Sequence, residues 1–278
     1  MMKRIGAILT VVIIAVAFMA LPALAGGLNK PSSKVREAQK LIDQAWNLDK
    51  VSASVTTYKQ CLALMKQADK LDPNNYSILI DLSRFNWLYG DNLPKETSEQ
   101  QKMLVKLYAA GMAAAGKSIK VKETVDAHYW FAVNKASSLE FSSIVSQAAG
   151  FPTIFKHSNY VTDNGPDYYY GAAGRLWSEI ITRVPKQVVK MVGVDVQMVT
   201  DLIDDAIKIE PRYLDNYVYK ARFIFTYYGK KDEALKLLEH VIKQKPEIFP
   251  EEVTANKVAI KDARELWKTI TGKDYPAR

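Results

Sequence analysis

Three stretches of the chain share one spacing of small residues and proline: CLALMKQADKLDP at Cys61–Pro73, VTDLIDDAIKIEP at Val199–Pro211 and ALKLLEHVIKQKP at Ala234–Pro246. In each stretch a second small or β-branched residue follows seven positions after the first (Ala68, Ala206 and Val241), and proline follows five positions later. Residues seven apart lie on one face of a helix, and small side chains there let a neighbouring helix pack closely. Proline ends each helix because its ring cannot sit in a helix interior.

The prolines recur at the interval of a helical hairpin. Pro211 and Pro246 are 35 residues apart, and Pro73 and Pro211 are 138 residues apart, which is close to four such periods. The pattern resembles that of the tetratricopeptide repeat, a helix–turn–helix unit of about 34 residues. Helical periodicity dominates the chain, and strand-like alternation is nearly absent. The sequence therefore predicts an all-α fold, a tetratricopeptide-like α-solenoid of antiparallel helix pairs, and solenoids mostly bind other molecules.

The first 25 residues have the features of an export signal. Lys3 and Arg4 precede an apolar run over residues 5–21, and Ala23-Leu24-Ala25 supplies the small residues that signal peptidase cuts after. A retained N-terminal membrane anchor is the alternative, and the cleavage region has no cysteine for lipid attachment. We expect residues 26–278 to form a single tetratricopeptide-like helical domain in the periplasm, without stable membrane insertion after cleavage.

Charge and motif content favour a binding protein over an enzyme. The formal net charge is +8, with lysines mixed among acids and no arginine–aromatic array of the kind that binds nucleic acid. The residues Gly111–Ser118 satisfy the phosphate-loop pattern, but they follow helix-forming residues instead of a strand, and Gly116 suits a helix C-cap. Cys61, the single cysteine, is expected to be a buried packing residue. We therefore expect no nucleic acid partner and no cofactor.

Catalytic and metal-ligand patterns are also missing from the sequence. The histidines His128, His157 and His240 share no short spacing, and the acidic group of Asp201, Asp204 and Asp205 is expected to be a solvated helix face. No nucleophile–base–acid series is recognisable. The expectation is a non-enzymatic protein without a metal site, with a hydrolase whose residues converge only in space as a remote alternative.

The middle of the chain departs from the repeat pattern. Gly150–Pro152 is expected to break the chain, so that residues 142–166 are less regular than the rest. The segment Gly165–Trp177 then combines three adjacent tyrosines, three glycines and Arg175. Two interpretations stand: a bent connection whose glycines permit close helix approach, or a cavity lined by aromatic residues in which Arg175 binds an anion.

Two segments resemble the T-component family of tripartite ATP-independent periplasmic (TRAP) transporter systems. They are Asp126–Ala132 (DAHYWFA) and the element from Gly171 through Arg175-Leu176-Trp177-Ser178 to Arg183-Val184-Pro185, followed by the proline-marked repeats. The resemblance implies a periplasmic homotrimer that pairs with a TRAP substrate-binding protein. It further implies a largely apolar channel that passes a small apolar or amphipathic organic acid between partners.

The expected ligand-binding residues lie in two groups, Tyr168, Tyr169, Tyr170, Arg175 and Trp177, and His128, Tyr129 and Trp130. In this hypothesis Arg175 is the charge partner of a carboxylate. The alternative is a tetratricopeptide scaffold for another cell-envelope assembly complex, which would bind a peptide in its concave groove.

Overall fold

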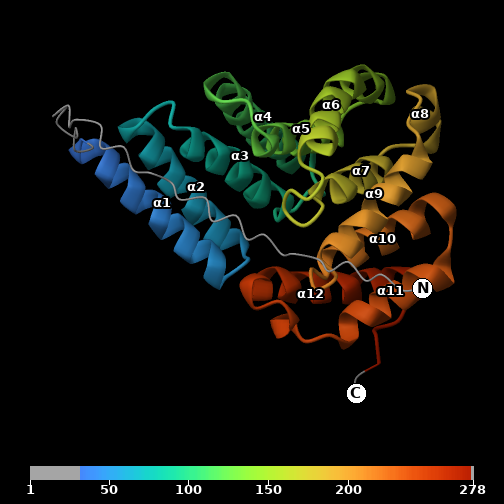
Figure 1. The fold of residues 1–278 in the computed structure, drawn as a ribbon. Coiled ribbons are helices and arrows are strands. Elements are labelled where there is room, and N and C mark those ends of the chain that lie inside the picture. The colour runs from blue at the N-terminus through green and yellow to red at the C-terminus, as the bar shows by residue number, and fades with distance from the viewer. Residues whose placement is uncertain (1–31, 277–278) are drawn as a thin grey trace, which may run out of the picture. The chain divides into compact units, whose positions relative to one another are not determined.

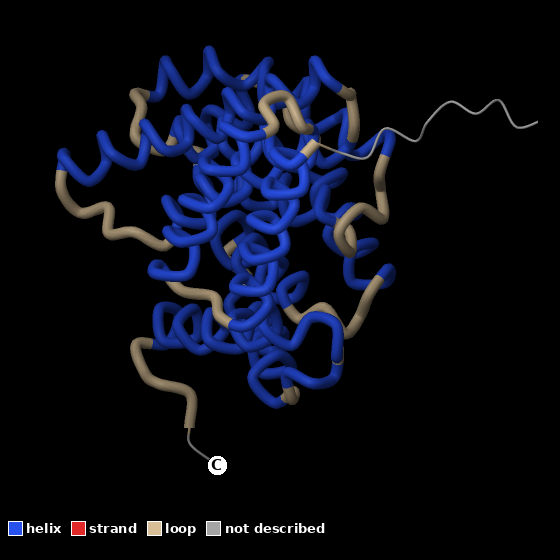
Figure 2. The backbone as a smooth tube through the Cα atoms, turned by 90° about the vertical axis from the view of Figure 1, so that its left-hand side faces the viewer, coloured by secondary structure: helices blue, strands red, loops and turns tan. Residues whose placement is uncertain are grey.

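Helices make up most of residues 32–276, the part of the chain that this computed structural model describes (Figures 1 and 2). The expected export signal, residues 1–25, lies outside the described residues. Across residues 32–276 there is no β-strand, and the helices pack mainly against their neighbours in the sequence. The fold is therefore the all-α, solenoid-like arrangement that the repeat spacing predicts.

The first six helices follow one another along the chain. They are α1 (Ser33–Val51), α2 (Val55–Leu71), α3 (Tyr76–Asp91), α4 (Ser98–Val121), α5 (Val125–Leu139) and α6 (Ile144–Asn164). Five of their starts carry side-chain caps: Ser32, Ser54, Asn75, Thr97 and Ser143 each accept a hydrogen bond from the backbone N–H three residues later. The start of α5 has no such cap. Such caps satisfy N–H groups that have no partner within the helix.

A turn over residues 165–171 leads into the second half of the chain. Its helices are α7 (Ala172–Arg183), α8 (Lys186–Met191), α9 (Val196–Ile209), α10 (Asp215–Phe223), α11 (Lys231–Lys243) and α12 (Val253–Thr271). A π-helical turn, Ile224–Tyr228, extends α10, and two short 3₁₀ turns, Pro246–Ile248 and Pro250–Glu252, separate α11 from α12. The short α8 interrupts the regular alternation, and α7 packs against α9.

The three repeated stretches begin within the helices α2, α9 and α11 and run just past their C-terminal ends. These helices end at Leu71, Ile209 and Lys243, two or three residues before the prolines. All six of the small positions have an exposed fraction of 0%: Cys61, Ala68, Val199, Ala206, Ala234 and Val241. The spacing therefore marks close helix–helix contacts, as predicted.

Alternate helices form an inner layer that bends back on itself. Contacts run from α3 to α5, α5 to α7, α7 to α10 and α10 to α12. The Trp46 indole N–H in α1 donates to Asp81 in α3 at 2.9 Å. At the far end, the Thr254 hydroxyl at the start of α12 donates to the carbonyl of Lys50 in the last turn of α1, at 2.7 Å. Figure 1 shows the end of α1 beside the start of α12, so the inner layer closes into a ring.

Two sequence expectations are wrong. Residues 144–164 form one helix that continues through Pro152, because the neighbouring Phe151 and Ile154 are 1% and 2% exposed and their burial offsets the lost backbone hydrogen bond. The phosphate-loop pattern Gly111–Ser118 lies wholly inside α4, so Gly116 is an interior residue and not a C-cap. Within residues 32–276, no helix combines the length and the hydropathy needed to cross a bilayer.

Candidate ligand-binding site

The tyrosine-rich turn lies inside the ring of inner helices. Tyr169, Tyr170 and Gly171 have φ angles of 43°, 58° and 81°, three consecutive left-handed residues. Tyr168 contacts Tyr129 of α5, with ring centroids 5.6 Å apart, and Tyr170 donates a hydrogen bond to Glu252 at 3.2 Å. Left-handed backbone is costly for residues other than glycine, so the turn requires support from its surroundings.

Arg175 supplies that support. Its guanidinium donates to the carbonyls of Tyr170 (3.1 Å) and Tyr169 (2.6 Å) and to the side-chain oxygen of Asn216 (2.5 Å). Arg175 is 3% exposed, and its Nε lies 3.9 Å from the carboxylate of Asp215. Burial alone would lower the pKa of Arg175, but the neighbouring Tyr213, Tyr129 and Asp215 raise it above its ordinary value. The guanidinium therefore stays charged. These contacts give Arg175 a structural role in the turn.

The glycines of the same segment allow close helix approach, as one of the two interpretations predicts. A Cβ atom at Gly171 would lie 2.5 Å from the Cα and Cβ atoms of Ala206 in α9. One at Gly174 would lie 2.5 Å from the carbonyl oxygen of Leu202 and 2.8 Å from the Cα of Ile203. The backbone of α7 therefore lies directly against α9 at these positions.

A pocket lies beside this turn, between α5, α6 and α7. Counted together with its solvent-open mouth, the hollow has a volume of about 680 Å³. Its wall is mainly apolar and is formed by Val133, Ala136, Leu139, Phe151, Ile154, Leu176 and Ile180. Trp87 of α3, Tyr129 of α5 and Tyr219 of α10 add aromatic rings. Concave, mostly apolar pockets with a few polar groups are the usual form of small-molecule sites.

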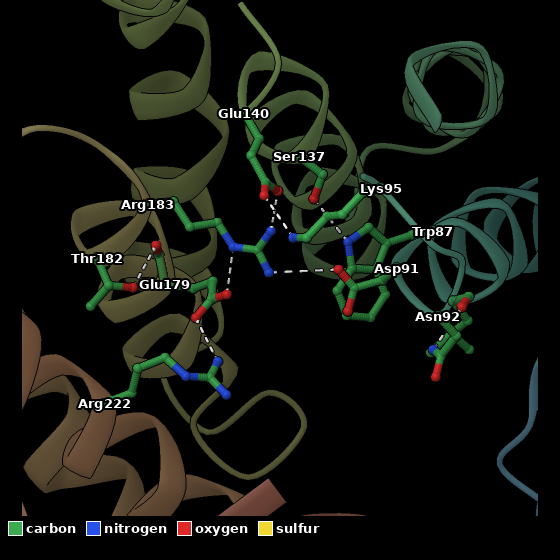
Figure 3. Close-up of polar contacts among 11 residues, drawn as sticks. Trp87, Asp91, Asn92, Lys95, Ser137, Glu140, Glu179, Thr182, Arg183 and Arg222 are labelled. Atoms are coloured by element: carbon green, nitrogen blue, oxygen red, sulfur yellow. Dashed lines mark hydrogen bonds and ion pairs between the residues drawn. The ribbon is translucent and has the colours of Figure 1, made fainter. Parts of the chain in front are cut away.

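One side of the pocket carries a network of charges (Figure 3). Arg183, at the end of α7, donates to Glu140, the residue that follows α5, and to Glu179 of α7, each at 2.5 Å. It also lies 3.6 Å from Asp91 of α3. Lys95 donates to Glu140 at 2.7 Å, and Arg222 of α10 donates to Glu179 at 3.2 Å. The network ties together four helices around the pocket.

Burial and pairing act against each other within this network. Burial alone would raise the pKa of Glu179, but Arg183 and Arg222 lower it below its ordinary value. Burial raises the pKa of Asp91, and Arg183 offsets only part of that effect. Of these two carboxylates, Glu179 is the one that its arginine partners hold in the charged form.

One polar atom of the pocket lining, on Gln147, is buried without a partner among residues 32–276. Gln147 is 8% exposed; its amide N–H donates to the carbonyl of Ser142 at 3.2 Å, while its Oε1 is buried without a hydrogen bond. Tyr129 and Tyr219 also line the pocket. Burial raises the pKa of Tyr129 to about 12, which keeps its hydroxyl protonated.

Seven of the eight predicted site residues lie in three places. Tyr129 and Arg175 line the pocket, and Trp130 lies next to it, with its ring 5.9 Å from that of Trp87. Tyr168, Tyr169 and Tyr170 form the supported turn. Trp177 is 2% exposed, and its indole N–H donates to Thr162 at 3.3 Å.

His128 belongs to a buried histidine pair instead of the pocket. Its Nδ1 lies 3.1 Å from Nδ1 of His157, and its Nε2 lies 3.2 Å from Glu123. The ring of His128 stacks on Tyr160, and that of His157 stacks on Phe131. Burial lowers the pKa of both histidines, that of His157 to about 4.

The sequence did not identify Trp87, Glu140, Gln147, Glu179 or Tyr219 as site residues. A signal was present in α7, where Glu179 and Arg183 are four residues apart and therefore share a helix face. Nothing in the sequence links α3, α5, α6 and α10 to that face. Within residues 32–276 no group of three or more His, Cys, Asp or Glu side chains could hold a metal ion. Among known proteins, no family model and no curated protein matches this chain.

Proposed function

We propose that the protein is a non-enzymatic periplasmic accessory protein of a TRAP-type uptake system, which binds a small apolar or amphipathic molecule and hands it over. The observation that carries the proposal is the pocket between α5, α6 and α7, with its apolar wall and polar rim. The resemblance of Asp126–Ala132 and Gly171–Pro185 to T-component proteins is the reason for proposing a TRAP system. It is also the reason for proposing a TRAP substrate-binding protein as the partner. A homotrimer is part of the same proposal.

The turn that packs against the inner helices favours this function over that of a peptide-binding scaffold. A peptide would lie along the inner helices, where the turn of residues 165–171 packs against Tyr129, Tyr213 and Phe249. The pocket lies instead between layers and suits a small molecule.

Ligand binding can be tested with N-phenylnaphthylamine, an uncharged fluorophore that brightens in apolar surroundings. We expect saturable binding by the purified protein, and loss of binding in Ala136→Phe, which fills the pocket from α5. Ala109→Phe, on the exposed side of α4, is the matched control and should bind normally. Equal binding by Ala136→Phe and the wild-type protein would refute the assignment of the pocket.

The partner can be tested by affinity capture from a periplasmic extract, with mass spectrometry of the retained proteins. We expect recovery of a TRAP substrate-binding protein. Recovery of outer-membrane or cell-wall assembly proteins in its place would favour the scaffold function.

A further inference from the structure

Charges around the pocket are balanced in pairs. Two lining arginines and two cations paired with lining carboxylates each contact a carboxylate. Arg175 contacts Asp215, and Arg183 contacts Glu140, Glu179 and Asp91. Lys95 contacts Glu140, and Arg222 contacts Glu179. Four carboxylates thus face four cations. A ligand carboxylate would find every cation engaged and would lie near Glu140 and Glu179. A ligand ammonium group would likewise find every carboxylate already paired and would lie near the arginines. Burying a charge without a partner costs about as much free energy as many other contacts contribute.

Arg175 is the least available of these cations. Its two terminal nitrogens already donate to the carbonyls of Tyr169 and Tyr170 and to Asn216. A carboxylate could bind Arg175 only if the guanidinium left these carbonyls, which belong to a left-handed turn. The arrangement therefore opposes the charge pairing that the sequence suggests for Arg175.

The unpartnered polar atom of the lining is uncharged. Gln147 offers a buried carbonyl oxygen, and the bond from its amide N–H to Ser142 fixes which end of the amide is free. This oxygen accepts a hydrogen bond and cannot donate one. Tyr129 and Tyr219 offer hydroxyl groups that can donate.

We infer that the pocket takes an uncharged amphipathic molecule whose polar group is a hydroxyl, an inference that rests on the proposed carrier function. A hydroxyl donates to Oε1 of Gln147 and accepts from a tyrosine O–H, while its hydrocarbon part lies against the apolar wall. A carboxylate has no proton for Gln147. If the natural ligand is an organic acid, its carboxylate stays outside the pocket.

Displacement of N-phenylnaphthylamine at neutral pH by octanol, octanoate and octylamine tests this selectivity with one chain length and three head groups. We expect octanol to compete at concentrations at least tenfold lower than either charged compound. Octanoate competing as well as octanol would overturn the inference and leave the proposed function standing. Failure of the fluorophore itself to bind would count against both.

Substitutions in the lining test which side chains bind the hydroxyl group. Gln147→Leu removes the acceptor at nearly constant volume and should weaken octanol about tenfold, the usual effect of losing one buried hydrogen bond, without changing the affinity for the fluorophore. The double variant Tyr129→Phe/Tyr219→Phe should weaken octanol in the same way. Tyr89→Phe, in α3 and outside the lining, is the matched control. Unchanged octanol affinity in both the Gln147 variant and the double tyrosine variant would overturn the inference.

Discussion

At the scale of single residues, the contact between His128 and His157 requires that at least one ring be neutral. The two Nδ1 atoms lie 3.1 Å apart, so one must donate and the other must accept. If both rings were protonated, two N–H groups would face each other. Lys156 lowers the pKa of both histidines further, and only Glu123, beside His128, acts in the opposite direction.

Stability should therefore fall on acidification. Both histidines have a folded-state pKa below the ordinary value of 6.5, so their contribution is fully present above pH 6.5 and is lost as pH falls toward about 4. For His157 the loss is on the order of 3 kcal/mol. Urea unfolding at a series of pH values measures it. His157→Gln should flatten the profile, whereas His240→Gln, at an exposed position, should not; an unaltered profile in His157→Gln would contradict the account.

This pair also shows where sequence information ends for individual side chains. His128 and His157 are 29 residues apart, on α5 and α6, and meet only because those helices pack together. The sequence indicated Tyr129 and Arg175, which do line the pocket, because aromatic clusters and an arginine among glycines are locally visible. Gln147 carries no local signal, since its importance lies in a missing partner.

At the scale of helices, the approach of α7 to α9 depends on Gly174. A methyl group there would lie 2.5 Å from the backbone oxygen of Leu202, and backbone cannot move aside as a flexible side chain can. We expect Gly174→Ala to lower the free energy of unfolding by about 2–3 kcal/mol.

The matched control is Gly116→Ala within α4. The new methyl group would lie 3.4 Å from Phe131, an ordinary contact, and alanine is the better helix former by about 1 kcal/mol. Chemical denaturation should show opposite changes in the two variants. A Gly174→Ala protein as stable as the wild type would mean that α7 can shift away from α9.

Helix positions were predictable for α2, α9 and α11, where small residues and a following proline mark the C-terminal half; Ser54 and Asp195 also cap the starts of α2 and α9. The helix α6 was not predicted, because local signals at Gly150 and Pro152 oppose it. What decides α6 is tertiary packing: Gly150 allows close contact with Leu139 of α5, and Phe151 and Ile154 are buried. Local helix propensity therefore predicts secondary structure poorly where burial against a neighbouring helix opposes it.

At the scale of the whole molecule, the ring is closed by few contacts. Thr254→Val removes the hydroxyl that donates to the Lys50 carbonyl. Because this contact is exposed, we expect the global free energy of unfolding to change by less than about 1 kcal/mol. Amide hydrogen exchange should nevertheless become faster in the last turn of α1 and the first turn of α12.

Thr254→Ser keeps the hydroxyl and should exchange like the wild type. Exchange that is unchanged in Thr254→Val, or faster throughout the molecule, would show that this bond does not control closure.

The fold class was predictable because helix pairing is a local property of the sequence. Closure was not, since it depends on small rotations that accumulate over all the inner helices.

The meeting of α1 and α12 also bears on how such a chain can evolve. Open solenoids can gain or lose repeats, because each unit contacts only its neighbours. Here one additional hairpin would carry the last helix past the first and separate Thr254 from Lys50. The number of repeats is therefore constrained by geometry, and duplication of a hairpin should be less tolerated in this chain than in an open array.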